Sequence, residues 1–282
     1  TLSLDKDGKL GDLKGWVSMN NRSGATFKDA KLKLLAGEVQ RAQPANNRRM
    51  EFGMAMDAAA KSNGFAEETF ADYHLYTLQR PATVANNEIK QISLLEAFRV
   101  PVVKKLVLDW FGNPAVGDSL ARSEGTVGGT ARPQVRIEFV NDEKSKLGMP
   151  LPEGNFKVFQ HDSSGSVQLL GEDRIQHTPK KEKLSLVVGR AFDVVAERKQ
   201  TTFEWIGSAN NRRGTRRTIE IEIRNRKNSA ESVTVLERHG GQWKVLKTSQ
   251  DWVKLDSNTM QYVVNLKPDE TKTVIYTVET TW

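Results

Sequence analysis

The sequence predicts an all-β protein with two β-sandwich-like units, the C-terminal one immunoglobulin-like, joined by a mixed β segment. Short apolar segments recur every 8–12 residues or so, as in sandwich folds, and turn residues separate them. One segment, residues 218–225, alternates strictly between apolar and charged residues. The chain has 282 residues, with 38% apolar and 27% charged residues, a composition that excludes collagen-like, coiled-coil and grossly disordered classes.

The N-terminal part reads as β-strands around one long insertion. Alternating or β-branched patterns predict strands at residues 13–19, 31–37, 72–78, 89–95 and 99–108. Residues 41–68 change character and read as the long insertion, in which the Ala- and Met-rich residues 50–61 could form a short helix.

The middle of the chain continues the β pattern. Residues 113–132 are rich in Gly, Ser and Thr and predict a loop. Strands are expected at residues 135–140, 154–160, 166–170, 184–188 and 192–197, with a hairpin turn at Asp162-Ser163-Ser164-Gly165. The charged stretch 197–200 favours a domain boundary near residues 190–200, which divides the chain into domains 1–195 and 196–282.

The C-terminal part has the clearest pattern. Ile219, Ile221 and Ile223 alternate with charged residues, which is typical of a half-buried antiparallel strand. Gly240-Gly241 predicts a tight hairpin between strands 233–239 and 242–247. Two further strands are expected at 260–266 and 271–277.

The net charge of +7 is concentrated in one stretch. Residues 197–227 contain nine basic and four acidic residues. A basic surface with an aromatic residue could bind an anionic polymer or a protein partner, and its candidate residues are Arg212, Arg213, Arg216, Arg217 and Trp205. The alternative is a solvated loop flanked by salt-bridged strands. No nucleic-acid-binding motif is present, so no nucleic acid partner is expected.

Several function classes lack their residues. There is no cysteine, so thiol nucleophiles, iron–sulfur ligation and disulfides are excluded, and the apolar stretches are too short for a membrane span. The four histidines lack metal-ligand spacing, and a calcium loop built on Asp5-Lys6-Asp7-Gly8 would place Lys14 at its bidentate position. The sequence contains neither a Gly-x-x-x-x-Gly-Lys loop nor a Gly-x-Gly-x-x-Gly fingerprint, the two glycine motifs that bind nucleotide phosphates. We expect no metal and no cofactor.

Ser119 is the candidate catalytic residue, because Gly117-Asp118-Ser119-Leu120 matches the nucleophile signature of one hydrolase class. The surrounding residues predict a loop, and no Asp stands three residues before a His as that class requires. The acid pairs at 67–68, 142–143 and 172–173 are the other candidates, since glycoside hydrolysis needs two nearby carboxyl groups. Adjacency in the sequence does not set the distance between two carboxyl groups, and solvated turns are the alternative interpretation that we favour for these pairs. These residues support, as an alternative, a hydrolase acting on envelope polysaccharide or its ester decorations.

An ordered set of short motifs runs through nearly the whole chain, from about Gly11 to the end. It comprises residues 15–17 (Gly-Trp-Val), 21–24, 29–32, 36–37, 73–78, 87–91, 151–154, 170–173, 177–179 (His-Thr-Pro) and 189–193. The set resembles the bacterial domain of unknown function at the C-terminal end of mucoidy-inhibitor-A-like proteins. The resemblance implies an exported, periplasmic or extracellular, envelope-associated β protein with no established catalytic set, and a family domain that begins upstream of Thr1. It favours a non-catalytic binding or scaffolding module.

Overall fold

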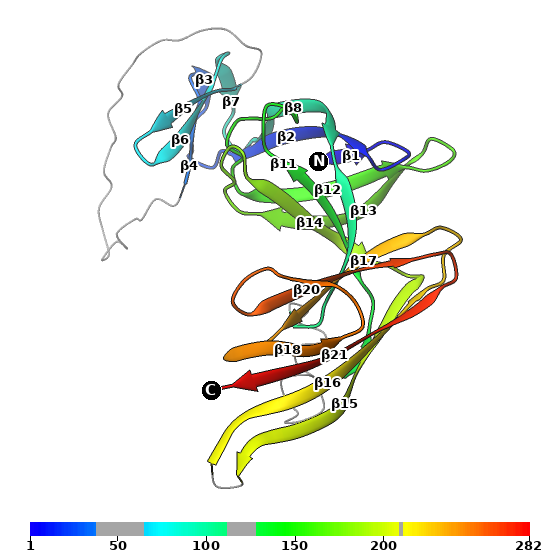
Figure 1. The fold of residues 1–282 in the computed structure, drawn as a ribbon. Coiled ribbons are helices and arrows are strands. Elements are labelled where there is room, and N and C mark those ends of the chain that lie inside the picture. The colour runs from blue at the N-terminus through cyan, green and yellow to red at the C-terminus, as the bar shows by residue number, and fades with distance from the viewer. Residues whose placement is uncertain (38–64, 112–127, 209–210) are drawn as a thin grey trace. The chain divides into compact units, whose positions relative to one another are not determined.

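The computed structural model describes residues 1–37, 65–111, 128–208 and 211–282. These residues form strands and contain no α-helix, which confirms the all-β prediction (Figure 1). They divide into two compact units. The first comprises Thr1–Val102 and Phe139–Leu186, and the second Val103–Glu138 and Val187–Trp282.

The first unit contains one large sheet and two small ones. Its strands are β1 (Leu2–Leu4), β2 (Leu10–Asn20), β3 (Phe27–Ala30), β4 (Lys33–Ala36), β5 (Phe65–Phe70), β6 (Tyr73–Leu78), β7 (Ala82–Val84), β8 (Ile89–Pro101), β12 (Gly154–His161) and β13 (Val167–Ile175). The large sheet has the order β13-β12-β1-β2-β8, with β1 parallel to β12, and the small sheets are β3-β7 and β4-β6-β5. Tyr76 is buried in a small core under β6, where its hydroxyl donates to the carbonyl of Pro150 at 2.7 Å.

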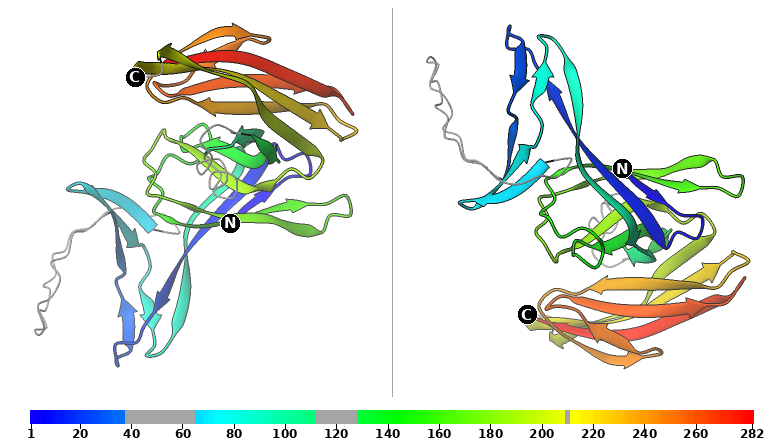
Figure 2. Two further views of the ribbon diagram at one scale, coloured as in Figure 1. Left: turned by 90° about the horizontal axis from the view of Figure 1, so that it is seen from below. Right: turned by 90° about the horizontal axis from the view of Figure 1, so that it is seen from above.

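The second unit is a sandwich of two sheets. Its strands are β9 (Val103–Asp109), β10 (Gly129–Ala131), β11 (Gln134–Val140), β14 (Lys183–Arg190), β15 (Val194–Ser208), β16 (Asn211–Asn225), β17 (Glu231–Arg238), β18 (Gln242–Thr248), β19 (Trp252–Lys254), β20 (Thr259–Leu266) and β21 (Thr271–Thr281). Strands β11 and β14 each cross from one unit into the other. One sheet has the order β10-β15-β16-β21-β18 and the other β14-β11-β9-β17-β20-β19, and the two layers are visible in Figure 2.

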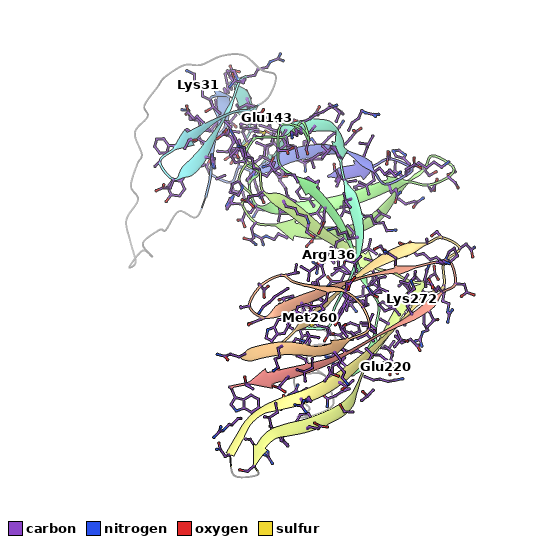
Figure 3. All side chains as sticks on the ribbon, in the orientation of Figure 1. Lys31, Arg136, Glu143, Glu220, Met260 and Lys272 are labelled. Carbon is purple, nitrogen blue, oxygen red and sulfur yellow. The ribbon has the colours of Figure 1, made fainter. Side chains whose placement is uncertain are left out.

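Alternation along the strands builds the core of this sandwich. Ile219, Ile221 and Ile223 point inward from β16 and are buried, as the strict alternation predicts. Val235 on β17 and Met260 on β20, the latter labelled in Figure 3, supply buried side chains from the opposite sheet. Each fully buried side chain of this size contributes about 1.5–3 kcal/mol relative to exposure, so this inner face holds the two sheets together.

The hairpin predicted at Gly240-Gly241 is wrong. Strand β17 pairs with β9 and β20, whereas β18 pairs with β21, so the two glycines connect strands in different sheets. A hairpin within one sheet and a connection between two sheets have the same sequence pattern. In both, each flanking strand buries one face, so its alternation of apolar and polar residues is unchanged. The turn at Asp162–Gly165, by contrast, joins the antiparallel pair β12 and β13 as predicted.

The division into units differs from the single predicted boundary near residue 195. Strand β9 belongs to the second unit, where Leu106 lies opposite Val233 in a parallel pairing. Such pairing joins strands more than a hundred residues apart, and local turn signals carry no information about it. Two further expectations are corrected: β5 occupies the end of the predicted insertion 41–68, and β10 lies within the predicted loop 113–132. The helix considered at 50–61 lies outside the described residues.

The strand order also differs in detail from an immunoglobulin constant domain. Among the seven strands β15 to β21, the first, second, seventh and fourth share one sheet, and the third, sixth and fifth share the other. In the constant-type fold the fifth and seventh strands occupy each other's places. The C-terminal region is therefore a two-sheet sandwich with its own order, extended by the earlier strands β9, β10, β11 and β14.

Candidate functional site

The inner face of the sheet containing β15 and β16 changes from apolar to polar toward one end. On β15, buried Ala196 is followed at the next inward positions by Arg198 and Gln200. On β16, buried Ile219 is followed toward the hairpin by Arg217. Because successive inward positions are two residues apart, these polar side chains replace core residues where the sandwich opens.

A pocket of about 320 Å³ occupies this open end of the second unit, and we call it the end pocket. Its polar wall includes Arg198, Gln200, Thr215, Arg217 and His239. The rest of the lining comprises Phe111, Ile219, Arg238, Gly240, Gly241, Val278, Thr280 and Trp282. The volume is at the lower end of the range for small-molecule sites, so the pocket suits one small polar unit.

The floor of the end pocket is a buried ion pair. The Arg198 guanidinium donates to the Glu237 carboxylate from Nε at 2.9 Å and from Nη2 at 2.8 Å. Arg198 is 3% exposed and Glu237 is fully buried. The Tyr276 hydroxyl donates to the same carboxylate at 2.5 Å. Both charges are therefore compensated and hydrogen-bonded, as burial requires.

Opposing effects set the pKa values of this cluster. Burial disfavours the charged form of Arg198, but the Glu237 carboxylate outweighs burial and raises the pKa of the guanidinium above its ordinary value. Burial and the same carboxylate together raise the pKa of Tyr276. Arg198 therefore stays charged and Tyr276 stays neutral. The positive charge of Arg198 is balanced by the Glu237 carboxylate, so this ion pair contributes no net charge to the pocket.

Arg217 differs from its neighbour because it has no acidic partner. Among the described residues, no carboxylate lies within ion-pair distance of its guanidinium, and its Nε is buried without a hydrogen-bond acceptor. One side of the guanidinium stacks on the Phe203 ring, with Cζ 5.4 Å from the ring centre. Burial and the repulsion of Arg198 lower its pKa, although a guanidinium remains protonated at neutral pH. Arg217 thus holds a half-buried, uncompensated positive charge at the pocket wall.

His239 lies at the end of β17, on the opposite side of the pocket. Its Nε2 is buried without a partner, and its ring packs edge-on against Tyr276, with centroids 5.8 Å apart. Burial lowers its pKa to about 4, and repulsion from Arg198 and Arg217 adds to burial against the attraction of Glu237. His239 is therefore neutral at pH 7 and offers one unpaired ring nitrogen rather than a charge.

An aromatic–arginine face continues from the end pocket along the β15–β16 hairpin, whose strands run past the end of β21 in Figure 1. We define it as Phe203, Trp205, Arg212, Arg217 and Trp282. Arg212 stacks on Trp205 with Cζ 4.2 Å from the ring centre, and Phe203 and Trp282 pack edge-on against the same ring at 5.1 and 6.3 Å. Trp205 and Trp282 are 46% and 68% exposed. Large exposed aromatic residues beside cations are typical of a binding surface rather than of a core.

A β-bulge places Arg212 on this face. The pairing register shifts between Ile206 and Gly207, which leaves Arg213 as an extra residue on β16. Arg212 consequently falls on the same side of the ladder as Trp205. Gly207 has a φ of 103°, and a Cβ there would lie 2.2 Å from a backbone oxygen, so the bulge requires glycine.

The residues of the predicted basic surface therefore lie on two opposite faces of β16. Arg212 and Arg217 lie on the aromatic–arginine face with Trp205, whereas Arg216 lies on the outer face. There the guanidinium of Arg216 pairs with Glu279 at 2.9 Å and Glu204 at 3.4 Å, so the salt-bridged alternative describes this residue. Arg213 is exposed, and its carbonyl accepts a hydrogen bond from the Trp282 N–H at 3.2 Å.

The catalytic candidates are not brought together. Ser119 lies outside the described residues. The pairs 67–68 and 172–173 lie on β5 and β13, where successive side chains point to opposite faces, and Glu67 pairs with His74 at 2.8 Å. No described residue lining the end pocket has a carboxylate side chain. Within the same described ranges, no three His, Asp or Glu side chains are grouped as metal ligands.

Sequence reasoning missed Arg198, Glu237 and His239 as site residues. A signal was available on β15, since Arg198 stands at an inward position of a strand whose earlier inward residues are apolar. Glu237 occupies the same kind of position on β17, after buried Val233 and Val235. Two opposite charges at inward positions of facing strands predict a buried ion pair. The sequence does not show that β15 and β17 lie in facing sheets, because that depends on the crossover at Gly240-Gly241.

Comparisons of the chain with protein-family models, with curated protein sequences and with solved structures found no match. In the part of the chain that the structure describes, no helix has the length and apolar character needed to cross a membrane. The geometry of the second unit therefore carries the functional argument.

Proposed function

We propose that this protein is a non-catalytic binding or scaffolding module of the bacterial envelope and that its aromatic–arginine face binds an anionic polymer. The observation that carries the proposal is the uncompensated, half-buried guanidinium of Arg217, which continues into the Arg212–Trp205 stack. Exposed stacked aromatics offer contact area, and the arginines supply charge. The exported location rests on the resemblance to mucoidy-inhibitor-A-like proteins and on no structural feature.

Equilibrium binding to defined polymers tests this function. The probes are polygalacturonate, which carries carboxylates, polyphosphate, and neutral dextran as the uncharged reference. We expect the anionic polymers to bind and dextran not to bind, with affinity falling between 50 and 500 mM salt because screening weakens exposed charge pairs. Binding that ignores both polymer charge and salt contradicts the proposal.

Matched variants assign binding to the face. Arg212→Gln removes the cation stacked on Trp205 and should weaken polymer binding about two- to fivefold, because an exposed charge pair contributes up to about 1 kcal/mol. Arg224→Gln removes a cation from the outer face of the same strand, where its guanidinium pairs with Glu222 at 2.8 Å, and should leave binding unchanged. Equal effects of the two variants would mean that net charge, not this face, controls binding.

The hydrolase alternative is tested in the same samples by assaying for released sugars or acyl groups. Product release that Ser119→Ala abolishes would establish catalysis and replace the binding proposal. Polymer binding without product supports the binding module.

A further inference from the structure

The end pocket contains three arginines but only one uncompensated charge. Glu237 offsets Arg198, and the Asp109 carboxylate, 2.7 Å from Arg238, offsets the guanidinium at the rim. Arg217 has no such partner among the described residues, and His239 is neutral at pH 7. The side chains that line the pocket therefore present a net charge of one, which matches a singly charged anionic group better than a doubly charged one.

The shape of the charged group also restricts the ligand. A guanidinium presents a planar fork of N–H donors that matches the two oxygens of a carboxylate. The Cζ of Arg217 lies 5.4 Å from the centre of the Phe203 ring, so one side of this fork packs against an aromatic side chain. A phosphate monoester carries about −1.5 to −2 charges at pH 7 and would bring more charge than the pocket offers.

The remaining walls suit a polar ring. Gln200, Thr215 and His239 offer neutral polar groups, whereas Phe111 and Trp282 offer aromatic surface. A pocket of about 320 Å³ holds one ring-sized unit and no longer segment.

We propose that the end pocket binds a single carboxylated sugar-sized unit, with its carboxylate on Arg217 and its ring against Trp282. This inference rests on the proposed function and deepens it: the aromatic–arginine face holds the anionic polymer, and the end pocket selects a carboxylate-bearing terminal unit.

Titration with small probes tests the pocket separately from the polymer. We would titrate the full chain with D-glucuronate, D-glucose, glucose 6-phosphate and glucose 6-sulfate, and follow binding by calorimetry. Glucuronate should bind at least tenfold more tightly than each of the other three. Glucose that binds as tightly as glucuronate would show that the charge of the ligand does not matter. Glucose 6-phosphate or glucose 6-sulfate that binds at least as tightly as glucuronate would overturn the assignment of the ligand group as a carboxylate.

Variants of neighbouring arginines on β16 identify the group that binds. Arg217→Gln should weaken glucuronate binding about 30-fold or more, the usual consequence of truncating a desolvated charge partner. Arg217→Lys keeps the charge but loses the planar fork and should recover only part of this loss. Arg216→Gln, on the outer face, is the matched control and should not change binding. Glucuronate binding that is unchanged in Arg217→Gln, or equally weakened in Arg216→Gln, overturns the inference.

A measurement on the unsubstituted protein keeps the test independent of variant folding. The indole N–H of Trp282, assigned by Trp282→Phe, should shift in the NMR spectrum as glucuronate is added, because this ring lines the end pocket. Shifts confined to other tryptophans contradict the assignment. Polymer binding without glucuronate binding refutes the carboxylate site in the end pocket and leaves the proposed function standing. Glucuronate binding without polymer binding supports the site in the end pocket and refutes the proposed function.

Discussion

The buried pair of Arg198 and Glu237 makes a sharp prediction about stability. Glu237→Gln keeps the size and shape of the side chain but removes the negative charge that compensates the Arg198 guanidinium. That guanidinium is 3% exposed, so solvent compensates little of the lost negative charge. Removing one member of such a pair costs about 3–5 kcal/mol, because an uncompensated charge remains buried.

The same cost can be expressed as a shift in the unfolding midpoint. A unit of this size loses about 3 °C for each kcal/mol, so the midpoint of the second unit should fall by roughly 9–15 °C. Tryptophan fluorescence is a suitable probe, since five of the six tryptophans lie in the second unit. The first unit should unfold at its original temperature.

Two comparisons make this prediction refutable. Glu222→Gln removes a carboxylate 2.8 Å from Arg224 in a pair that is about one-third exposed, and should cost at most about 1 kcal/mol. The double substitution Arg198→Met with Glu237→Leu removes both charges and should recover much of the loss, because no charge stays buried. If Glu237→Gln costs no more than Glu222→Gln, burial of the Arg198–Glu237 pair does not control the stability of the second unit.

Three further predictions concern His239, Gly214 and Tyr76. The pKa of His239 is depressed to about 4 from the ordinary 6.5, so between these pH values the unfolded chain binds a proton that the folded chain does not. The free energy of unfolding of the second unit should therefore fall by about 3 kcal/mol as the pH drops from 6.5 to 4. His239→Gln should flatten this dependence when denaturation is measured at a series of pH values. Gly214→Ala places a Cβ 2.2 Å from the backbone oxygen of Thr280 and should cost about 1–3 kcal/mol by calorimetry, whereas Gly154→Ala meets no atom within 4 Å and should be nearly neutral. Tyr76→Phe removes a buried hydrogen bond to a backbone carbonyl and should lower the midpoint of the first unit by the equivalent of about 1–3 kcal/mol, and an unchanged midpoint would contradict the role of this bond.

The sequence by itself determined the fold class and many of the strands. Alternation at Ile219, Ile221 and Ile223 predicts the buried face of β16, because a strand exposes successive residues to opposite sides. The turn at Asp162–Gly165 was predictable as well, since its conformation depends on residues within the turn. Charge and aromatic content alone also point to Arg212, Arg217 and Trp205 as candidate binding residues.

Only the tertiary structure decided how these parts meet. The Gly240–Gly241 connection crosses between sheets, which places Glu237 opposite Arg198 and opens the end pocket beside it. A one-residue bulge at Arg213 brings Arg212 onto the same face as Trp205, whereas Arg216 joins acids on the outer face. Strand pairing and register depend on contacts between residues far apart in the chain, and local propensity is the same for the alternatives. The sequence therefore determined which residues are basic, aromatic or inward-facing, and long-range packing decided which of them form a site.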